Sequence, residues 1–218
     1  MPTTYDHIAG QSKERLAAIS DGIFGVAMTL MLLELHTPVA AAVKGEWSLL
    51  VAMKGIAPAF LVYLMSYLTL GIFWVGQQTQ LNHLDRSDRH LTWMHLGFLF
   101  FVTIVPLSTR LLTEFIELRV ALLFYWFNIF LLGSTLLVSW RYAIAAGLVA
   151  DSIPGEIRDA ICRRIVIGQS LYAACAALCI VNTYCSMAFI VLVQVNYVIA
   201  PHLWWSRDFA AGPDDDEE

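Results

Sequence analysis

The sequence predicts an all-α integral membrane protein with six transmembrane helices. Of its 218 residues, 58% are hydrophobic and only 14% are charged, whereas a soluble domain usually has about 25% charged residues. Six apolar segments also reach the roughly 17–25 residues that a helix needs to cross a bilayer. We expect these spans at about residues 16–36, 49–78, 91–112, 119–143, 160–181 and 186–205.

The expected helices differ in their regularity. The first runs without interruption to a polar stop at residues 34–38. The second is longer than a bilayer requires and contains Lys54 and Pro58 near its start, so we expect an interfacial turn and then a tilt or kink at Pro58. Pro106 should distort the last turns of the third. The short link at 182–186 predicts that the fifth and sixth helices form an antiparallel hairpin.

The distribution of lysine and arginine predicts the orientation in the membrane. An even number of spans places both termini on one side, and cytoplasmic loops are enriched in these residues. The side of the termini carries Lys13, Arg15, Arg86, Arg89, Arg141, Arg158, Arg163, Arg164 and Arg207, and the other carries Lys44, Lys54, Arg110 and Arg119. We therefore expect a cell-membrane protein with a cytoplasmic N-terminal segment (1–14), a six-helix transmembrane domain (15–206) and an acidic cytoplasmic tail (207–218).

The sequence also argues against several functional classes. It shows no nucleophile motif, no glycine-rich phosphate loop and no Cys or His spacing typical of a metal site. We therefore expect neither an enzyme nor a protein that depends on a cofactor. Membrane lipids are the expected surroundings, and we expect no nucleic-acid partner and no small-molecule substrate.

The first expected helix has sides of different character. At about 100° per residue, Leu30 lies about 40° from Val26 and Leu33 about 20° from it on the other side, so the three form one apolar stripe with Thr29 at its edge. The stripe could pack against another helix, with Gly22 permitting close approach. It could instead face the same stripe of symmetry-related copies, where rings of apolar side chains form a constriction that gates by dewetting. The spacing leaves both interpretations open.

Two charged side chains of this helix need partners outside it. Arg15 and Asp21 lie about 120° apart on an ideal helix and cannot pair with each other. A carboxylate inside a membrane helix is costly and needs a partner or a path to water. Polar candidates at a comparable depth are Gln77, Gln78, Asn82 and His95.

The segment Arg15-x-x-x-Ile19-Ser20-Asp21, followed by Gly-Ile-Phe-Gly-Val-Ala-Met-Thr-Leu, resembles the R-x-x-x-F-S-D signature of the transmembrane protein 175 family. This family comprises potassium-selective channels, lysosomal in animals, with a short six-helix form in prokaryotes. The resemblance covers about residues 12–206. Further matches follow in order at Phe73-Trp74, Asp88-Arg89 and Pro106-Leu107-Ser108-Thr109.

The resemblance implies a homotetramer of six-helix subunits in which the first helix of each subunit lines a central pore for potassium ions. The family has no T-V-G-Y-G carbonyl filter, and neither has this chain. By position after the Asp, the constriction of the family maps onto Val26, Leu30 and Leu33, and its nearby hydroxyl maps onto Thr29. Its polar network maps onto Arg15, Ser20, Asp21, Trp74 and Gln77.

Three positions depart from the family pattern. Ile19 stands in place of a Phe, and Val26 stands where Ile or Leu is usual, which would leave a wider or wetter neck. Gln77 and Gln78 replace a frequent His pair, and an amide cannot titrate. We therefore expect a potassium-permeable channel. The alternatives are a proton or weakly selective cation leak of the same fold, or a small secondary transporter, although no inverted repeat of the transporter type is obvious.

Overall fold

The computed structural model describes residues 12–35 and 43–199, and this part of the chain folds into six α-helices. Each helix coincides with one of the expected spans, so the predicted all-α fold with six helices is confirmed. A short 3-10 turn at Leu178–Ile180 joins the fifth helix to the sixth. The helices are α1 (Lys13–Leu33), α2 (Glu46–Asn82), α3 (Arg89–Glu114), α4 (Arg119–Ala145), α5 (Gly155–Ala177) and α6 (Thr183–Ile199).

Five of these helices are long and apolar enough to cross a membrane. The sixth, α6, has 17 residues in the described part of the chain, and the expected end of its span at residue 205 lies outside that part. The expected polar stop from residue 36 and the acidic tail also lie outside it. Large apolar side chains such as Trp47, Phe100 and Val120 are exposed on the outer faces of the helices, as expected where helices meet lipid.

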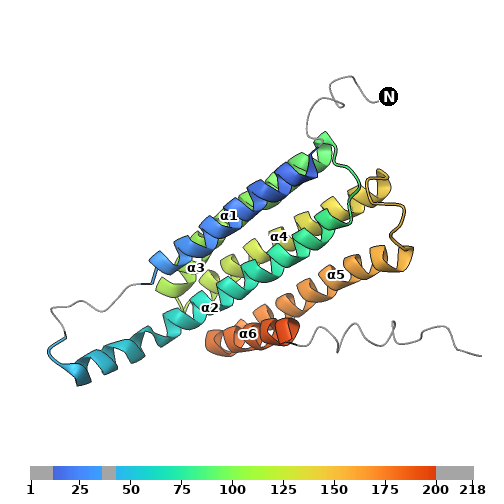
Figure 1. The fold of residues 1–218 in the computed structure, drawn as a ribbon. Coiled ribbons are helices and arrows are strands. Elements are labelled where there is room, and N and C mark those ends of the chain that lie inside the picture. Colours follow the sequence, from blue (N-terminus) through green and yellow to red (C-terminus); the bar gives the residue numbers. More distant parts are fainter. Residues whose placement is uncertain (1–11, 36–42, 200–218) are drawn as a thin grey trace, which may run out of the picture.

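The helices lie alongside one another as a bundle (Figure 1). α1 and α3 form one side, α2 and α4 the middle, and α5 and α6 the other side, in agreement with the contacts between helices. The core between α1, α2 and α3 is aromatic: the ring centroid of Phe98 lies 6.0 Å from that of Phe24 and 6.3 Å from that of Phe73. The buried side of α1 is therefore defined by its packing on two other helices.

The prolines do not interrupt their helices. α2 is helical from Glu46 through Pro58 to Asn82, and α3 continues past Pro106 to Glu114. The interfacial turn expected before Pro58 is therefore wrong. The first turns of α2 extend beyond the rest of the bundle (Figure 1). Membrane helices tolerate proline where other groups satisfy the backbone carbonyl that the proline leaves without a donor.

One end of the bundle gathers the start of α1 and two connections. Lys13 Nζ donates a hydrogen bond to the backbone oxygen of Leu84, 2.8 Å away, in the α2–α3 connection. Leu84 pairs with Val149 of the α4–α5 connection in an isolated antiparallel bridge. The segments that carry most of the arginines therefore share one end of the bundle, which we call the basic end.

The centre of the bundle is held by a polar network. Gln194 Nε2 on α6 donates to Thr69 Oγ1 on α2 at 2.7 Å and to the hydroxyl of Tyr172 on α5 at 3.1 Å. Thr69 Oγ1 also lies 3.0 Å from the hydroxyl of Tyr125 on α4. Polar side chains of this kind bind membrane helices together, so this network fixes α6 on α2, α4 and α5.

A glycine on α4 permits a close approach of α5. A Cβ at Gly133 would lie 1.6 Å from Gln169 Nε2, which donates to the backbone oxygen of Ile129 at 3.2 Å. A Cβ at Gly168, by contrast, would meet nothing within 4 Å.

We expect Gly133→Leu to lower the free energy of unfolding in detergent by about 1–3 kcal/mol, because the leucine displaces Gln169 and overpacks the contact. Gly168→Leu adds the same side chain and serves as the matched control, with little loss expected. Thermal unfolding of both variants checks the prediction, and equal midpoints for the two would contradict the packing described.

Candidate functional site

One face of α1 is buried in the bundle. Its buried residues recur every three or four positions, as on one side of a helix, and this face packs on α2 and α3. It includes one polar side chain, Ser20, among apolar ones. The buried residues are Leu16, Ser20, Phe24, Ala27 and Met31.

A different side of α1 carries the predicted apolar stripe. Val26, Leu30 and Leu33 are 58%, 45% and 78% exposed, and a Cβ at Gly22 or Gly25 would meet nothing within 4 Å. Within the described part of the chain, therefore, no other helix packs on this stripe. Of the two interpretations left open by the spacing, packing of the stripe on another helix of the same chain is not seen among the described residues.

Thr29 lies on the exposed side of α1 beside the stripe. Its Oγ1 donates to backbone oxygens of its own helix, 2.9 Å from Val26 O and 3.0 Å from Gly25 O. A hydroxyl has one donor and two acceptor lone pairs. The hydroxyl proton is therefore used within the helix, and the oxygen keeps acceptor capacity on the exposed side.

Asp21 on α1 is contacted by two side chains of α2. Trp74 Nε1 donates to Asp21 Oδ1 at 2.7 Å, and Gln78 Nε2 donates to the same oxygen at 2.8 Å. Both donors lie on α2, one helical turn apart. We call these three residues the Asp21 cluster. Hydrogen bonds to a charged acceptor are stronger than those between neutral groups, so the cluster ties α1 to α2 next to the stripe.

A second contact joins the same helices one residue earlier on α1. Gln77 Nε2 donates to Ser20 Oγ at 2.9 Å, and Ser20 Oγ donates to the backbone oxygen of Leu16 at 2.8 Å. Both side chains are fully buried. Four of the five residues assigned to the polar network, Ser20, Asp21, Trp74 and Gln77, are therefore brought together by α1 and α2.

Arg15 does not join this network. Its side chain is exposed and has no hydrogen-bond or ion-pair partner among the described residues. His95, another candidate partner, is buried and places Nδ1 3.0 Å from Leu91 O on its own helix. Arg15 and Asp21 point in directions about 120° apart on α1. Arg15 therefore also points away from Trp74 and Gln78, the donors that bind Asp21.

Two features of the site do not follow from the predicted residue set. Gln78 completes the Asp21 cluster, although the sequence indicates it only as one of several polar candidates. Glu34 Oε2 lies 3.5 Å from Arg110 Nε, and the same nitrogen lies 3.1 Å from Glu114 Oε1. The one sequence signal for this pairing is the position of Arg110, a basic residue in the last turns of the third expected span.

In the described part of the chain, no group of three or more His, Cys, Asp or Glu could hold a metal ion.

Comparisons with known proteins point to one family. Residues 15–106, from α1 into α3, match the sequence model of the endosomal/lysosomal potassium channel TMEM175. A protein named potassium channel from Streptomyces collinus is 35% identical over 103 residues, which are 47% of this chain and 48% of the relative. The chain thus spans about half the length of that relative.

Two further relatives cover different shares of this chain and carry different names. A protein named potassium channel from Chamaesiphon minutus is 26% identical over 85% of this chain and 93% of its own length. A Danio rerio protein named endosomal/lysosomal proton channel TMEM175 is 31% identical over 51% of this chain and 22% of its own length.

A solved structure shares the fold. The crystal structure of a lysosomal potassium-selective channel TMEM175 homologue from Chamaesiphon minutus superposes with a TM-score of 0.74, covering 85% of this chain and 96% of that one at 24% identity. The resemblance indicated by the first-helix signature is thereby confirmed. Over residues 15–106 the chain is therefore similar to the TMEM175 family, a family of ion channels and not of enzymes.

Proposed function

We propose that the protein is a potassium-permeable ion channel whose pore is lined by α1 of four copies. One observation carries the proposal: α1 is held to α2 and α3 on one side, and its other side presents an unpartnered apolar stripe. A single bundle of six helices with one such stripe cannot enclose a pore, but several copies around an axis can. The names of the bacterial relatives support potassium as the ion.

The stripe would form a narrow neck. From Val26 to Leu33, seven residues apart, α1 rises about 10 Å, so rings of Val26, Leu30 and Leu33 line a short apolar passage. The carbonyls of a regular helix are bonded within it and cannot replace a hydration shell as a carbonyl filter does. Ions therefore pass the neck with partial dehydration, and the acceptor lone pairs of Thr29 offer the nearest protein oxygens.

Carboxylates lie beyond both ends of the neck. Asp21 precedes Val26 by five residues, a rise of about 7.5 Å, and accepts hydrogen bonds from the neutral donors Trp74 and Gln78. Glu34 directly follows Leu33 and shares Arg110 with Glu114. Negative charge at a mouth concentrates cations, which favours cation permeation through either end.

The topology completes the proposal. The basic end of the bundle would face the cytoplasm of a cell membrane, with both termini on that side, because positively charged segments stay inside. The channel domain would span residues 15–206, between the N-terminal segment 1–14 and the acidic tail 207–218. The assembly would be a homotetramer in lipid that needs no cofactor, with potassium as the permeant species.

A proton or weakly selective cation leak through the same pore is the second candidate. Two observations favour it: the vertebrate relative is named a proton channel, and Val26 narrows the neck less than a longer side chain would. A continuous file of water past Val26 would conduct protons. Reversal potentials under separate potassium, sodium and proton gradients distinguish the two candidates.

We expect Leu30→Ala and Val26→Ala to raise potassium flux from proteoliposomes and to lower the ratio of potassium to sodium flux. The shorter side chains widen their rings and lower the dewetting barrier. Val138→Ala, at an exposed apolar position on α4, is the matched control and should leave both quantities unchanged. Wild-type flux in both α1 variants would remove these residues from the pore.

The Asp21 cluster should set the flux through the orientation of α1. Trp74→Phe keeps an aromatic ring but removes the indole donor to Asp21, so we expect lower potassium flux per assembled channel. Trp126→Phe removes an indole N–H that has no partner in the described part of the chain and should have no effect.

A double-mutant cycle of Trp74→Phe with Asp21→Ala, which leaves no side-chain acceptor, separates the hydrogen bond from the two residues taken singly. The effects on flux should be clearly less than additive, because each variant disrupts the same bond. Fully additive effects on flux would contradict the proposed role of the Asp21 cluster.

The stoichiometry can be tested directly. Native mass spectrometry of the purified full-length protein should give four chains of 24.4 kDa each. A monomer that still conducts potassium in proteoliposomes would contradict a pore built from α1 of several copies.

A further inference from the structure

The C-terminal end of α1 carries negative charge without a cation of its own. Glu34 caps the helix, with its backbone N–H bonded to the oxygens of Met31 and Leu32, and the last turn contains no basic residue. The unpaired carbonyls at a helix C-terminus act as a partial negative charge, which favours nearby cations. The carboxylate of Glu34 adds to that charge, so the cation that balances it comes from another helix.

Arg110 of α3 supplies that cation. Its Nε lies 3.5 Å from Glu34 Oε2 and 3.1 Å from Glu114 Oε1, and it donates a hydrogen bond to Glu114. We call Glu34, Arg110 and Glu114 the outer triad, because α1 and α3 both end on the side of the bundle opposite the basic end. Two carboxylates share one guanidinium, so the outer triad keeps a net negative charge in each chain.

The guanidinium is held more closely by Glu114 than by Glu34. Glu114 follows Arg110 by four residues on the same helix, a spacing that favours an ion pair, and the contact to Glu34 is the longer of the two. The side chains of Arg110, Glu34 and Glu114 are 51%, 32% and 43% exposed, so water and dissolved ions reach all three. Glu34 is therefore only partly neutralised, and its field extends into the surrounding solution.

Glu34 lies beside the apolar stripe at its outer end. It directly follows Leu33, and at 100° per residue it points about 40° away from Leu30. Asp21, beyond the opposite end of the stripe, receives its hydrogen bonds from the two neutral donors of the Asp21 cluster. Of the two carboxylates that flank the stripe, therefore, Glu34 is the one for which the described part of the chain shows an ion pair.

We propose that Arg110 sets the negative potential at the outer mouth of the pore by partly neutralising Glu34. The inference rests on the proposed pore, which is lined by α1 of four copies. In that pore Glu34 attracts the permeating cations, and Arg110 is a positioning residue that acts through Glu34, while Glu114 draws the guanidinium away. Symmetry places four Glu34 side chains around one mouth, and negative potential at a mouth raises the local concentration of cations.

The three members of the outer triad should have effects of different sign at low ionic strength. Arg110→Gln removes the neutralising charge and should raise the conductance for potassium that enters from the outer side by about 2-fold. Glu34→Gln removes the attracting charge and should lower this conductance by about the same factor. Glu114→Gln leaves the guanidinium to Glu34 alone and should lower it too. Arg110→Lys keeps the positive charge and should conduct as wild type does.

The measurement is the single-channel current of the full-length protein in a planar bilayer, with the same low potassium concentration on both sides. The chloride of N-methylglucamine, a large organic cation, raises the ionic strength from about 0.01 M to about 1 M, which shortens the Debye length from about 30 Å to about 3 Å. The variants should then approach wild type, because screening weakens the field of exposed charges. At low ionic strength the inward current should change more than the outward current, because the outer triad lies at one mouth.

Arg119→Gln is the matched control at the same end of the bundle. Arg119 is exposed at the start of α4, whereas α1 packs on α2 and α3, and the ion pair of Glu34 is with Arg110. The variant changes the formal charge by the same amount as Arg110→Gln. It should nevertheless change the inward current much less at low ionic strength.

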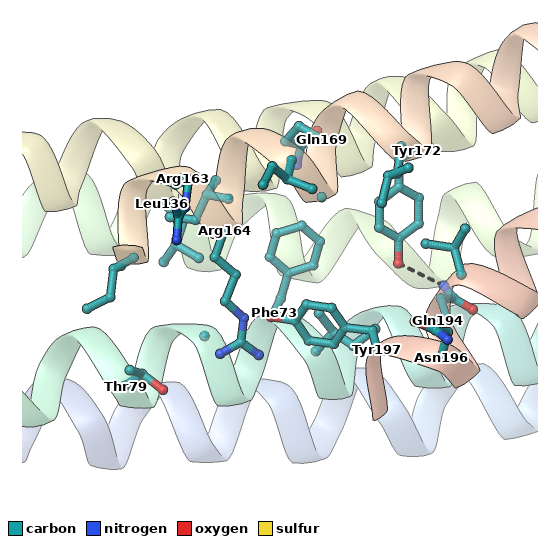
Figure 2. A pocket seen from close by; sticks show the side chains of 18 of the residues that line it. Phe73, Thr79, Leu136, Arg163, Arg164, Gln169, Tyr172, Gln194, Asn196 and Tyr197 are labelled. Atoms are coloured by element: carbon teal, nitrogen blue, oxygen red, sulfur yellow. Dashed lines mark hydrogen bonds between the residues drawn. The ribbon is translucent and has the colours of Figure 1, made fainter. Parts of the chain in front are cut away.

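A second control lies in a cavity of about 470 Å³ between α2, α4, α5 and α6, away from the exposed stripe of α1. Figure 2 shows side chains from α2 and α5 facing each other across this cavity, which we call the α2–α5 groove. Arg164, in the first half of α5, lines it, and its guanidinium carbon lies 4.4 Å from the centroid of the Tyr197 ring. Arg164→Gln therefore removes an arginine toward the basic end and should leave the inward current unchanged.

Three results would overturn the inference while leaving the pore in place. They are an equal inward current in wild type and Arg110→Gln at low ionic strength, a change in Arg110→Gln that persists at high ionic strength, and an effect of Arg119→Gln as large as that of Arg110→Gln. The second result would assign Arg110 to the packing of α1 on α3. An absence of potassium current in wild type would overturn the proposed pore as well.

The variants also separate a change in charge from a failure to assemble. Gel filtration in detergent shows whether each variant assembles as wild type does. Glu34→Gln and Glu114→Gln test the same inference without removing the arginine, so an Arg110→Gln protein that does not assemble leaves two informative variants. Unchanged inward current at low ionic strength in both of them would overturn the inference.

Discussion

The rotation of α1 about its own axis is fixed by hydrogen bonds to α2, and the proposed pore depends on that rotation. Asp21 receives two donors at 2.7 and 2.8 Å from Trp74 and Gln78, and the buried Ser20 receives a third from Gln77. Because adjacent residues of a helix point about 100° apart, bonds at Ser20 and Asp21 restrain two directions at once. The same bonds therefore also fix the direction in which the exposed stripe of α1 faces.

The membrane makes this restraint strong. A helix that meets lipid gains little from hiding an apolar side chain, so packing and polar contacts decide how membrane helices sit against one another. In α1 these contacts lie on one side, through Phe24 and Phe98 as well as Ser20 and Gln77. The apolar residues on the other side are suited to a core. They remain exposed because these contacts turn a different side of α1 toward α2 and α3.

Much of the fold follows from the sequence, because long apolar segments permit few structures in a membrane other than helices. Ser20, Asp21, Trp74 and Gln77 could also be identified, since the family signature marks positions on two neighbouring helices. Arg15 belongs to the same signature but lies on another side of α1, and only coordinates show that it stands apart. Pro58 misleads as a signal, because proline within a long helix need not end it.

The remaining features depend on pairs of residues that are distant in the chain. Arg110 meets Glu34 because the ends of α3 and α1 coincide, and no periodicity within either helix indicates this. Gln169 meets Gly133 because α5 crosses α4 at that level. The α2–α5 groove likewise arises from four helices, none of which shows an unusual pattern by itself. Such sites require the relative placement of helices, which the sequence of one helix does not determine.

The position of the constriction on a regular helix has an evolutionary consequence. A carbonyl filter is made of backbone, so its chemistry is nearly independent of side-chain identity. In the proposed tetramer each ring is one residue repeated by symmetry, and a single codon change at Val26 or Leu30 would alter four side chains at the same height. Such a pore can therefore change its ion preference in single mutational steps, without any change in the scaffold that Asp21 and Trp74 hold in place.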